Sequence, residues 1–154
     1  MKVGLYSGSF DPITNGHLDI IKRSAALFDK VVVLIGINIE KKYMFSLEER
    51  KKMVSEACMD FKNVTIDCTD LLTVEYSKKH NINFLIRSIR NSEDYSVENK
   101  LSYFNKELDS NLETIFLLAD EKYRHISSSS IKELHAYGQD ISKYVPYAVL
   151  KYFK

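Results

Sequence analysis

Apolar residues occur along this chain in short runs without polar alternation, separated by longer segments in which apolar residues recur every three or four positions. The clearest run, residues 30–37, is almost wholly apolar. A strand with this pattern is covered on both faces, as in a parallel sheet, whereas a half-exposed strand alternates apolar and polar residues. We predict five such strands, at residues 2–6, 30–37, 64–67, 84–86 and 114–118.

The segments between these runs carry helical signals. Apolar residues recur at helical spacing over residues 18–28, and Ser46 with Glu49 forms a capping box that opens a helix through about residue 61. Further helices are predicted over residues 71–80, 92–109 and 131–136, and a C-terminal helical segment over residues 140–154 with Pro146 in its first turn.

Strands and helices therefore alternate, which is typical of an α/β protein built on an open parallel sheet. We predict a doubly wound, five-stranded parallel sheet with helices on both faces, followed by the C-terminal helical segment. With 154 residues the chain is expected to form a single domain over residues 1–154. The helix over residues 92–109 is amphipathic, with one apolar face made by Val97, Leu101, Phe104 and Leu108.

Composition narrows the function classes. Lysine and arginine number 22 against 21 aspartate and glutamate, so bulk charge argues against a general binder of nucleic acid or of a membrane surface. Neither a signal peptide nor an apolar run of the roughly 20 residues that span a membrane occurs. Two cysteines, Cys58 and Cys68, are too few for a disulfide framework and are expected to be buried thiols without a role. We expect a cytoplasmic protein.

The stretch from Gly8 to His17 connects the first strand to the first helix. Its glycines let the backbone approach a ligand, and a helix that begins near Gly16 directs unpaired N–H groups at the same place, which favours phosphate. His17, in the first helical turn, would donate a hydrogen bond or carry charge toward a bound anion. The alternative is a tight turn formed by Pro12 and Asn15 with an exposed histidine.

Three other loops that follow strands carry cations or hydroxyl groups. Each set alone has an ordinary explanation, namely solvated charge or helix capping. Loops that follow parallel strands emerge at one edge of the sheet, where ligands bind near the switch in strand order. Together with His17, these residues predict a site for a ligand with more than one phosphate. The sets are Lys41 with Lys42, Arg87 with Arg90, and the serines 127–130.

Group transfer at phosphorus suits such a site, because this chemistry needs positioning and charge stabilisation more than a protein nucleophile. His17, Lys41 and Arg90 are the candidate catalytic residues that would stabilise charge on phosphorus. No Ser/His/Asp arrangement, no clustered Cys/His metal site and no carboxylate cluster competes in the sequence.

The residues also carry a family resemblance. Gly8 to Pro12 followed by Thr14 to His17 resembles the T/HxGH signature of the nucleotidyltransferase superfamily, and Ile126 to Ser129 resembles its ISSS-type signature. Loop spacing, the lysine pair, residues 46–50, residues 85–90 and Glu98 together are similar to the bacterial phosphopantetheine adenylyltransferase family over nearly the whole chain.

This resemblance implies a Rossmann-like subunit of a homohexamer that transfers AMP from ATP to 4′-phosphopantetheine with Mg²⁺. The products would be dephospho-coenzyme A and pyrophosphate, and coenzyme A is a candidate feedback ligand. By motif position, the acceptor would be bound by Ser9, Lys41, Thr73 and Arg87. ATP would be bound by Ser9, Phe10, His17, Ser88, Ile89, Arg90, Glu98, Tyr123, Arg124, His125, Ile126, Ser127, Ser128 and Ser129.

The sequence departs from the family pattern at Ser7, Tyr43 and Ser88, where proline, proline and glycine are usual. A side chain at Ser88 would narrow the nucleotide pocket. Two alternatives stay open at this point: a nucleotidyltransferase with another phosphate acceptor, such as nicotinamide mononucleotide or glycerol 3-phosphate, and a non-catalytic module that senses ATP or coenzyme A.

Overall fold

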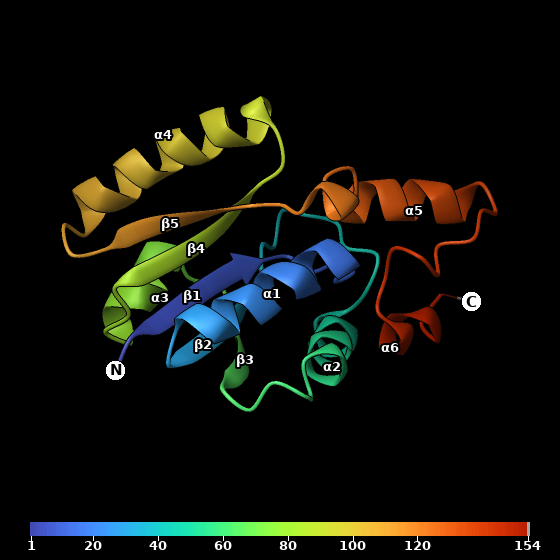
Figure 1. The fold of residues 1–154 in the computed structure, drawn as a ribbon, viewed down its shortest axis with the longest axis horizontal. Helices are drawn as coiled ribbons and strands as arrows, with labels where there is room; N and C mark the ends of the chain where they lie inside the picture. The colour runs from blue at the N-terminus through green and yellow to red at the C-terminus, as the bar shows by residue number, and fades with distance from the viewer. Residues whose placement is uncertain (154) are drawn as a thin grey trace.

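The computed structural model describes residues 1–153 and contains one parallel sheet of five strands (Figure 1). The strand order is β3-β2-β1-β4-β5, so the chain direction across the sheet switches between β1 and β4. In register, Leu5 of the central strand lies between Val32 and Leu85. The strands are β1 (Val3–Gly8), β2 (Lys30–Gly36), β3 (Val64–Thr69), β4 (Phe84–Ile89) and β5 (Glu113–Leu118).

Helices cover both faces of the sheet, as predicted. On one face, α1 (Asn15–Leu27) and α2 (Leu47–Ala57) pack on side chains such as Tyr6 and Val33. On the other face, α3 (Thr73–Lys79) packs on the alternate side chains, among them Leu5 and Leu34. Successive strand residues face opposite sides of the sheet, and helices cover both sides. Consecutive residues are therefore all buried, which explains the apolar runs without alternation.

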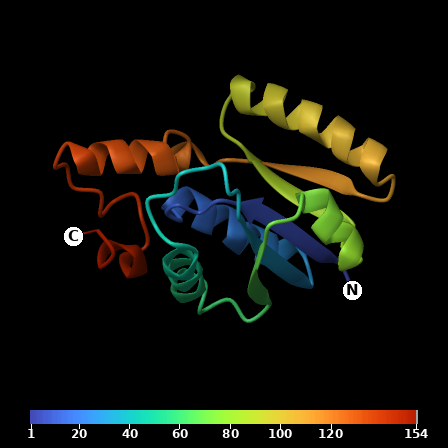
Figure 2. The same cartoon turned by 180° about the vertical axis from the view of Figure 1, so that it is seen from behind.

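The chain continues past the carboxyl ends of the strands. After β5 come a short 3₁₀ turn (Glu121–Tyr123), α5 (Ser128–Ala136) and α6 (Tyr147–Leu150). Figures 1 and 2 show α5 and α6 beyond the end of the sheet to which the strands point, away from the N-terminus. None of the helices within residues 1–153 is long and apolar enough to cross a membrane.

The predicted helix over residues 140–154 is wrong in extent, since only Tyr147–Leu150 is helical among its described residues. Pro146 is the N-cap and not part of the first turn. The residue before a proline is pushed out of the helical region, so the helix cannot extend upstream. The carbonyl of Tyr144 instead accepts the N–H of Asn15 at the start of α1, at 2.8 Å.

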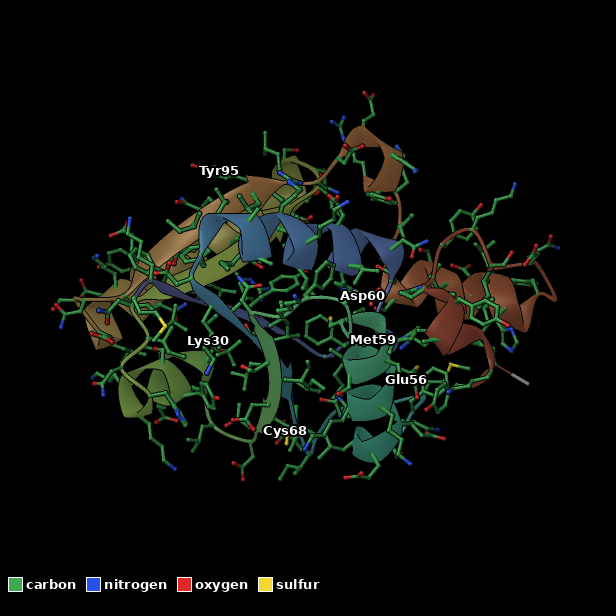
Figure 3. All side chains as sticks on the ribbon, turned by 60° about the horizontal axis from the view of Figure 1, so that its bottom comes forward. Lys30, Glu56, Met59, Asp60, Cys68 and Tyr95 are labelled. Carbon is green, nitrogen blue, oxygen red and sulfur yellow. The ribbon has the colours of Figure 1, made fainter. Side chains whose placement is uncertain are left out.

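Helix α4 (Ser92–Leu108) covers β4 and β5, and Tyr95 packs edge-on against Phe116 of β5 (Figure 3). Its apolar row is nevertheless open in this single chain. The exposed fractions are 59% for Val97, 47% for Leu101, 50% for Phe104 and 54% for Leu108. Periodicity aligned these side chains on one face, but it cannot say what covers that face.

The two cysteines differ in environment. Cys58 caps the C-terminus of α2 and is buried, and burial raises the pKa of its thiol to about 11. Cys68 lies within the edge strand β3, not after it, and is only partly buried (Figure 3). The expectation of a buried thiol is therefore correct for Cys58 and wrong for Cys68, because an edge strand has one uncovered side.

Candidate functional site

A cavity of about 240 Å³ opens at the switch point, where the carboxyl ends of β1 and β4 lie side by side. Ligands bind at such switch points in open parallel sheets. The cavity walls come from the ends of β1 and β4, the first turn of α1, the inward side of α4 and the start of α5. The lining residues are Tyr6, Ser7, Gly8, Thr14, Gly16, His17, Arg87, Ser88, Arg90, Asp94, Glu98, Ala119, Tyr123, Ile126, Ser127 and Ser128.

The loop between β1 and α1 is held from several directions. Phe10 has a left-handed backbone conformation, with φ of 49°, and its ring is buried against Tyr6 and His17. A Cβ on Gly8 would lie 3.2 Å from that ring, so a side chain there would have to displace the ring by a few tenths of an ångström. Because the Phe10 side chain is buried, only its backbone is available for the expected contact with ATP.

Asp11, a residue that the sequence analysis did not single out, anchors the far side of this loop. Its buried carboxylate accepts the N–H groups of Met44 and Phe45, each at 2.9 Å, and pairs with Lys132 at 3.2 Å. These bonds tie the loop after β1 to the loop after β2 and to α5. The only available signal was an acidic residue in a loop otherwise rich in small and apolar residues.

His17 sits in a reciprocal cap with Thr14, which is the N-cap of α1. The backbone N–H of Thr14 donates to Nδ1 of His17 at 3.0 Å, and the N–H of His17 donates to the Thr14 hydroxyl at 3.3 Å. Because Nδ1 accepts this hydrogen bond, it carries no proton in the neutral ring, and the ring proton is on Nε2. Threonine three residues before His17 is the spacing of a capping box, a signal present in the sequence.

The charge of His17 follows from its surroundings. Burial, together with the positive charges of Arg90 and Arg87, lowers the pKa of His17 from 6.5 to about 4. The ring is therefore neutral at physiological pH. Of the two roles left open by the sequence, the lowered pKa favours the neutral hydrogen-bond donor over the imidazolium.

Arg87 and Arg90 each have a carboxylate partner on α4. Arg87 donates two hydrogen bonds to Glu98, at 2.8 and 2.7 Å, and a third to the carbonyl of Ser7 at 2.8 Å. Arg90 pairs with Asp94 at 3.0 Å and reaches the carbonyl of Ile126 at 3.3 Å. Two parallel bonds fix the plane of a guanidinium, so Glu98 orients Arg87 across the cavity.

The serine run begins α5. Ser127 is the N-cap, and Ser127 and Ser130 bond each other through side chain and backbone in a capping box. The hydroxyl of Ser128 donates to the carbonyl of Pro12 at 2.8 Å, which joins α5 to the loop after β1. The interpretation that one serine of the run caps the helix is thus correct, and that serine is Ser127, which lines the cavity together with Ser128.

The predicted residues fall into three groups. Nine of them line the cavity: His17, Arg87, Ser88, Arg90, Glu98, Tyr123, Ile126, Ser127 and Ser128. Lys41 and Thr73 lie beside it, because the Lys41 ammonium is 3.0 Å from the Ser9 hydroxyl and the Thr73 hydroxyl is 3.5 Å from that of Ser7. Not among the lining residues are the buried Ile89 and the exposed Lys42, Arg124, His125 and Ser129.

Several lining residues were missed from the sequence. Tyr6, Ser7 and Ala119 lie at strand ends that read only as apolar or small, so nothing local distinguished them. Asp94 stands four residues after Arg90, a spacing typical of an ion pair, and this signal could have been used. Burial is the largest influence on Tyr6 and raises the pKa of its phenol, which stays protonated.

No group of three or more histidine, cysteine, aspartate or glutamate side chains within residues 1–153 could hold a metal ion. The two carboxylates that line the cavity, Asp94 and Glu98, are both paired with arginine. A divalent cation that served this site would therefore need ligands from a bound molecule.

Comparisons with known proteins agree with this geometry. A family model described as cytidylyltransferase-like matches residues 5–134. A phosphopantetheine adenylyltransferase from Shouchella clausii is 43% identical over 97% of this chain and 94% of its own length, and one from Finegoldia magna is 46% identical over 97% and 93%. A solved structure from Vibrio parahaemolyticus, provisionally named a nicotinate-nucleotide adenylyltransferase, has a TM-score of 0.72 at 20% identity and covers 99% of both chains, which supports the fold alone. The chain therefore belongs to the cytidylyltransferase-like family and, within it, to the phosphopantetheine adenylyltransferases.

Proposed function

We propose that this chain transfers the adenylyl group of ATP to 4′-phosphopantetheine, which yields dephospho-coenzyme A and pyrophosphate in the penultimate step of coenzyme A synthesis. Relatives more than 40% identical over nearly the full length carry the name of this enzyme. The observation that carries the proposal is the placement of His17, whose Nδ1 accepts the N–H of Thr14, in a cavity that Arg87 and Arg90 also line.

The reaction proceeds by direct in-line attack. A phosphate oxygen of the acceptor forms a bond to the α-phosphorus of ATP, and the bond from that phosphorus to the bridging oxygen breaks, releasing pyrophosphate. No covalent enzyme intermediate is required, because phosphoryl chemistry depends on positioning and on stabilising charge. The Nε2 proton of His17 would donate to an oxygen of the α-phosphate as its charge grows, with Lys41 and Arg90 adding positive charge.

The acceptor side of the site is assigned to Ser9, Lys41, Thr73 and Arg87. Three hydrogen bonds support this grouping. Lys41 donates to the Ser9 hydroxyl, Thr73 donates to the Ser7 hydroxyl, and Arg87 donates to the Ser7 carbonyl. All of them gather at the end of β1. The ATP side is assigned to the remaining residues, from the end of β4 to the start of α5, where helix amides favour phosphate oxygens.

Mg²⁺ would enter on the phosphates of ATP, since magnesium keeps several waters and commonly binds through substrate phosphates. The two cavity carboxylates, Asp94 and Glu98, are paired with arginines, so the nucleotide phosphates would supply the oxygen ligands of Mg²⁺. We further propose a homohexamer in the cytoplasm, with coenzyme A as a feedback ligand of the same site. The exposed apolar row of α4 supports self-association.

The test is an acceptor panel. Purified protein is incubated with Mg²⁺ and either ATP or CTP, and with 4′-phosphopantetheine, nicotinamide mononucleotide or glycerol 3-phosphate. We expect pyrophosphate and dephospho-coenzyme A only with ATP and 4′-phosphopantetheine. Turnover with another acceptor alone would reassign the substrate, and tight nucleotide binding without any turnover would favour a sensing module.

His17→Ala tests the assigned chemistry. Loss of one donor to developing charge lowers kcat by about 10²- to 10³-fold. Binding of ATP, measured by calorimetry, should change by less than about threefold, because the contact is made mainly in the transition state. An unchanged kcat would remove His17 from this role.

A further inference from the structure

The loop that carries Lys41, between β2 and α2, is organised around the ring of Tyr43. The phenol oxygen of Tyr43 accepts the backbone N–H of Asn38 at 3.0 Å, which closes the loop on itself. The Lys41 ammonium lies 5.5 Å from the centre of the ring, and the guanidinium of Arg50 lies 3.9 Å from it. Both cations are within the range of attraction to an aromatic face.

Arg50 provides a rigid support under this ring. Its side chain is only 1% exposed, and Nη1 donates to the carbonyl of Ser9 at 2.9 Å and to that of Gly36 at 3.2 Å. The ring of Tyr43 therefore rests on a guanidinium that is attached to the ends of β1 and β2. This support connects the lysine loop to the same backbone segment that carries Ser9.

These contacts form a closed ring of residues that begins and ends at Ser9. Ser9 binds Arg50 through its carbonyl, Arg50 stacks on Tyr43, Tyr43 faces Lys41, and Lys41 returns to the Ser9 hydroxyl at 3.0 Å. A lysine side chain on an exposed loop has much rotamer freedom to lose when it binds an anion. The contacts of Lys41 with the Tyr43 ring and the Ser9 hydroxyl already restrict its rotamers, so less conformational entropy is lost when it binds an anion.

We propose that Tyr43 is a positioning residue that holds Lys41 toward the acceptor phosphate. It acts through the hydrogen bond to Asn38, which shapes the loop, and through its ring, which attracts the Lys41 ammonium and lies on the guanidinium of Arg50. This inference rests on the proposed function, specifically on the role of Lys41 in binding the acceptor. Tyr43 itself need not touch either substrate.

The experiment is a double-mutant cycle between Tyr43 and Lys41. Tyr43→Leu should raise KM for 4′-phosphopantetheine about tenfold, a size typical of coupled neighbours, and leave KM for ATP within about twofold. Tyr43→Phe keeps the ring and loses the hydroxyl, so its effect should be smaller. Calorimetric affinity for 4′-phosphopantetheine is compared in both backgrounds: Tyr43→Leu should weaken it about tenfold when Lys41 is present and by less than about twofold in a Lys41→Ala background.

Tyr147→Leu serves as the matched control, because Tyr147 is exposed on α6, and we expect wild-type kinetics. An equal effect of Tyr43→Leu in both backgrounds would overturn the inference, as would an unchanged acceptor KM in Tyr43→Leu. The wild-type assay reports on the function separately. An inactive wild type overturns the proposed function, whereas an active wild type with a raised KM in Lys41→Ala and a normal KM in Tyr43→Leu overturns only the role of Tyr43.

Discussion

The state of His17 shows how much a single residue owes to its neighbours. A histidine at the start of a helix is a possible cation, and a cation near phosphates would be an attractive assignment. Its Nδ1, however, accepts the Thr14 amide, and two arginines line the same cavity. A third positive charge there is unfavourable, so the residue contributes a proton donor and leaves the charge to the arginines.

The low pKa of His17 predicts a pH-dependent stability. As pH falls through 6.5, the histidine of the unfolded chain takes up a proton, whereas the folded histidine does not until about pH 4. Protons bound only by the unfolded state lower the free energy of unfolding, so stability falls over this range. Between about pH 7 and pH 4.5, the titration of His17 should lower the free energy of unfolding by about 2 kcal/mol.

Urea unfolding of wild type and His17→Gln at these two pH values measures that cost. The wild type should lose about 2 kcal/mol more than the variant on acidification. Equal losses in both proteins would mean that the folded and unfolded pKa of His17 do not differ. The comparison cancels the other titrating groups, which the two proteins share.

At the scale of elements, α4 orients the two arginine side chains at the end of β4. Glu98 and Asp94 extend from one helix to Arg87 and Arg90 at the end of one strand. The resemblance assigned Glu98 to ATP. In the structure its carboxylate pairs with Arg87, a residue assigned to the acceptor, so a second candidate role is to orient that arginine.

Glu98→Gln separates these two assignments. Glutamine keeps one acceptor oxygen and loses the charge, so Arg87 is held less firmly. We expect KM for 4′-phosphopantetheine to rise about fivefold, and the free energy of unfolding to fall by about 1 kcal/mol. Glu107→Gln, at an exposed position of the same helix, is the control. A raised KM for ATP with a normal acceptor KM would instead support the assignment to ATP.

At the scale of the whole molecule, the apolar row of α4 bears on the proposed assembly. A helix that covers a sheet while its own apolar residues stay exposed has a surface that a partner would cover. Leu101→Lys with Phe104→Lys places two charges in this row. We expect the wild-type mass in light scattering to be a multiple of 17.9 kDa, and the mass of the variant to fall toward that value.

Asn99→Lys adds a charge at an exposed position on the same helix but away from this row, and should keep the wild-type mass. A wild type with the mass of one chain would contradict the proposed assembly. An unchanged mass in the double variant would show that another surface forms it.

Local sequence determined most elements of the fold. The five strands, the main helices and the cap at Ser46 follow from spacings of two to four residues, which the sequence displays directly. The sequence also indicated a cap within the serines 127–130, but the structure identified it as Ser127 and began the helix at Ser128, earlier than the predicted residue 131. The cations and hydroxyls were also expected at one edge of the sheet, because every loop that follows a parallel strand emerges there. Arg87 lies at that edge but within β4 (Phe84–Ile89) and not in the loop after it, because the strand is longer than the apolar run 84–86 indicated. The helix over residues 140–154 was overestimated where a tertiary hydrogen bond to Asn15 replaces a helical one.

The tertiary structure decided the properties that depend on residues far apart in the chain. The charge of His17 depends on its burial and then on Arg90 and Arg87, the orientation of Arg87 on Glu98, and the anchoring of the loop after β1 on Asp11, Arg50 and Lys132. By itself, the sequence determined which elements form and which edge of the sheet carries the chemistry. Burial and pairing across the fold assigned each side chain its charge state and its partner, because these depend on distances in space that no local spacing contains.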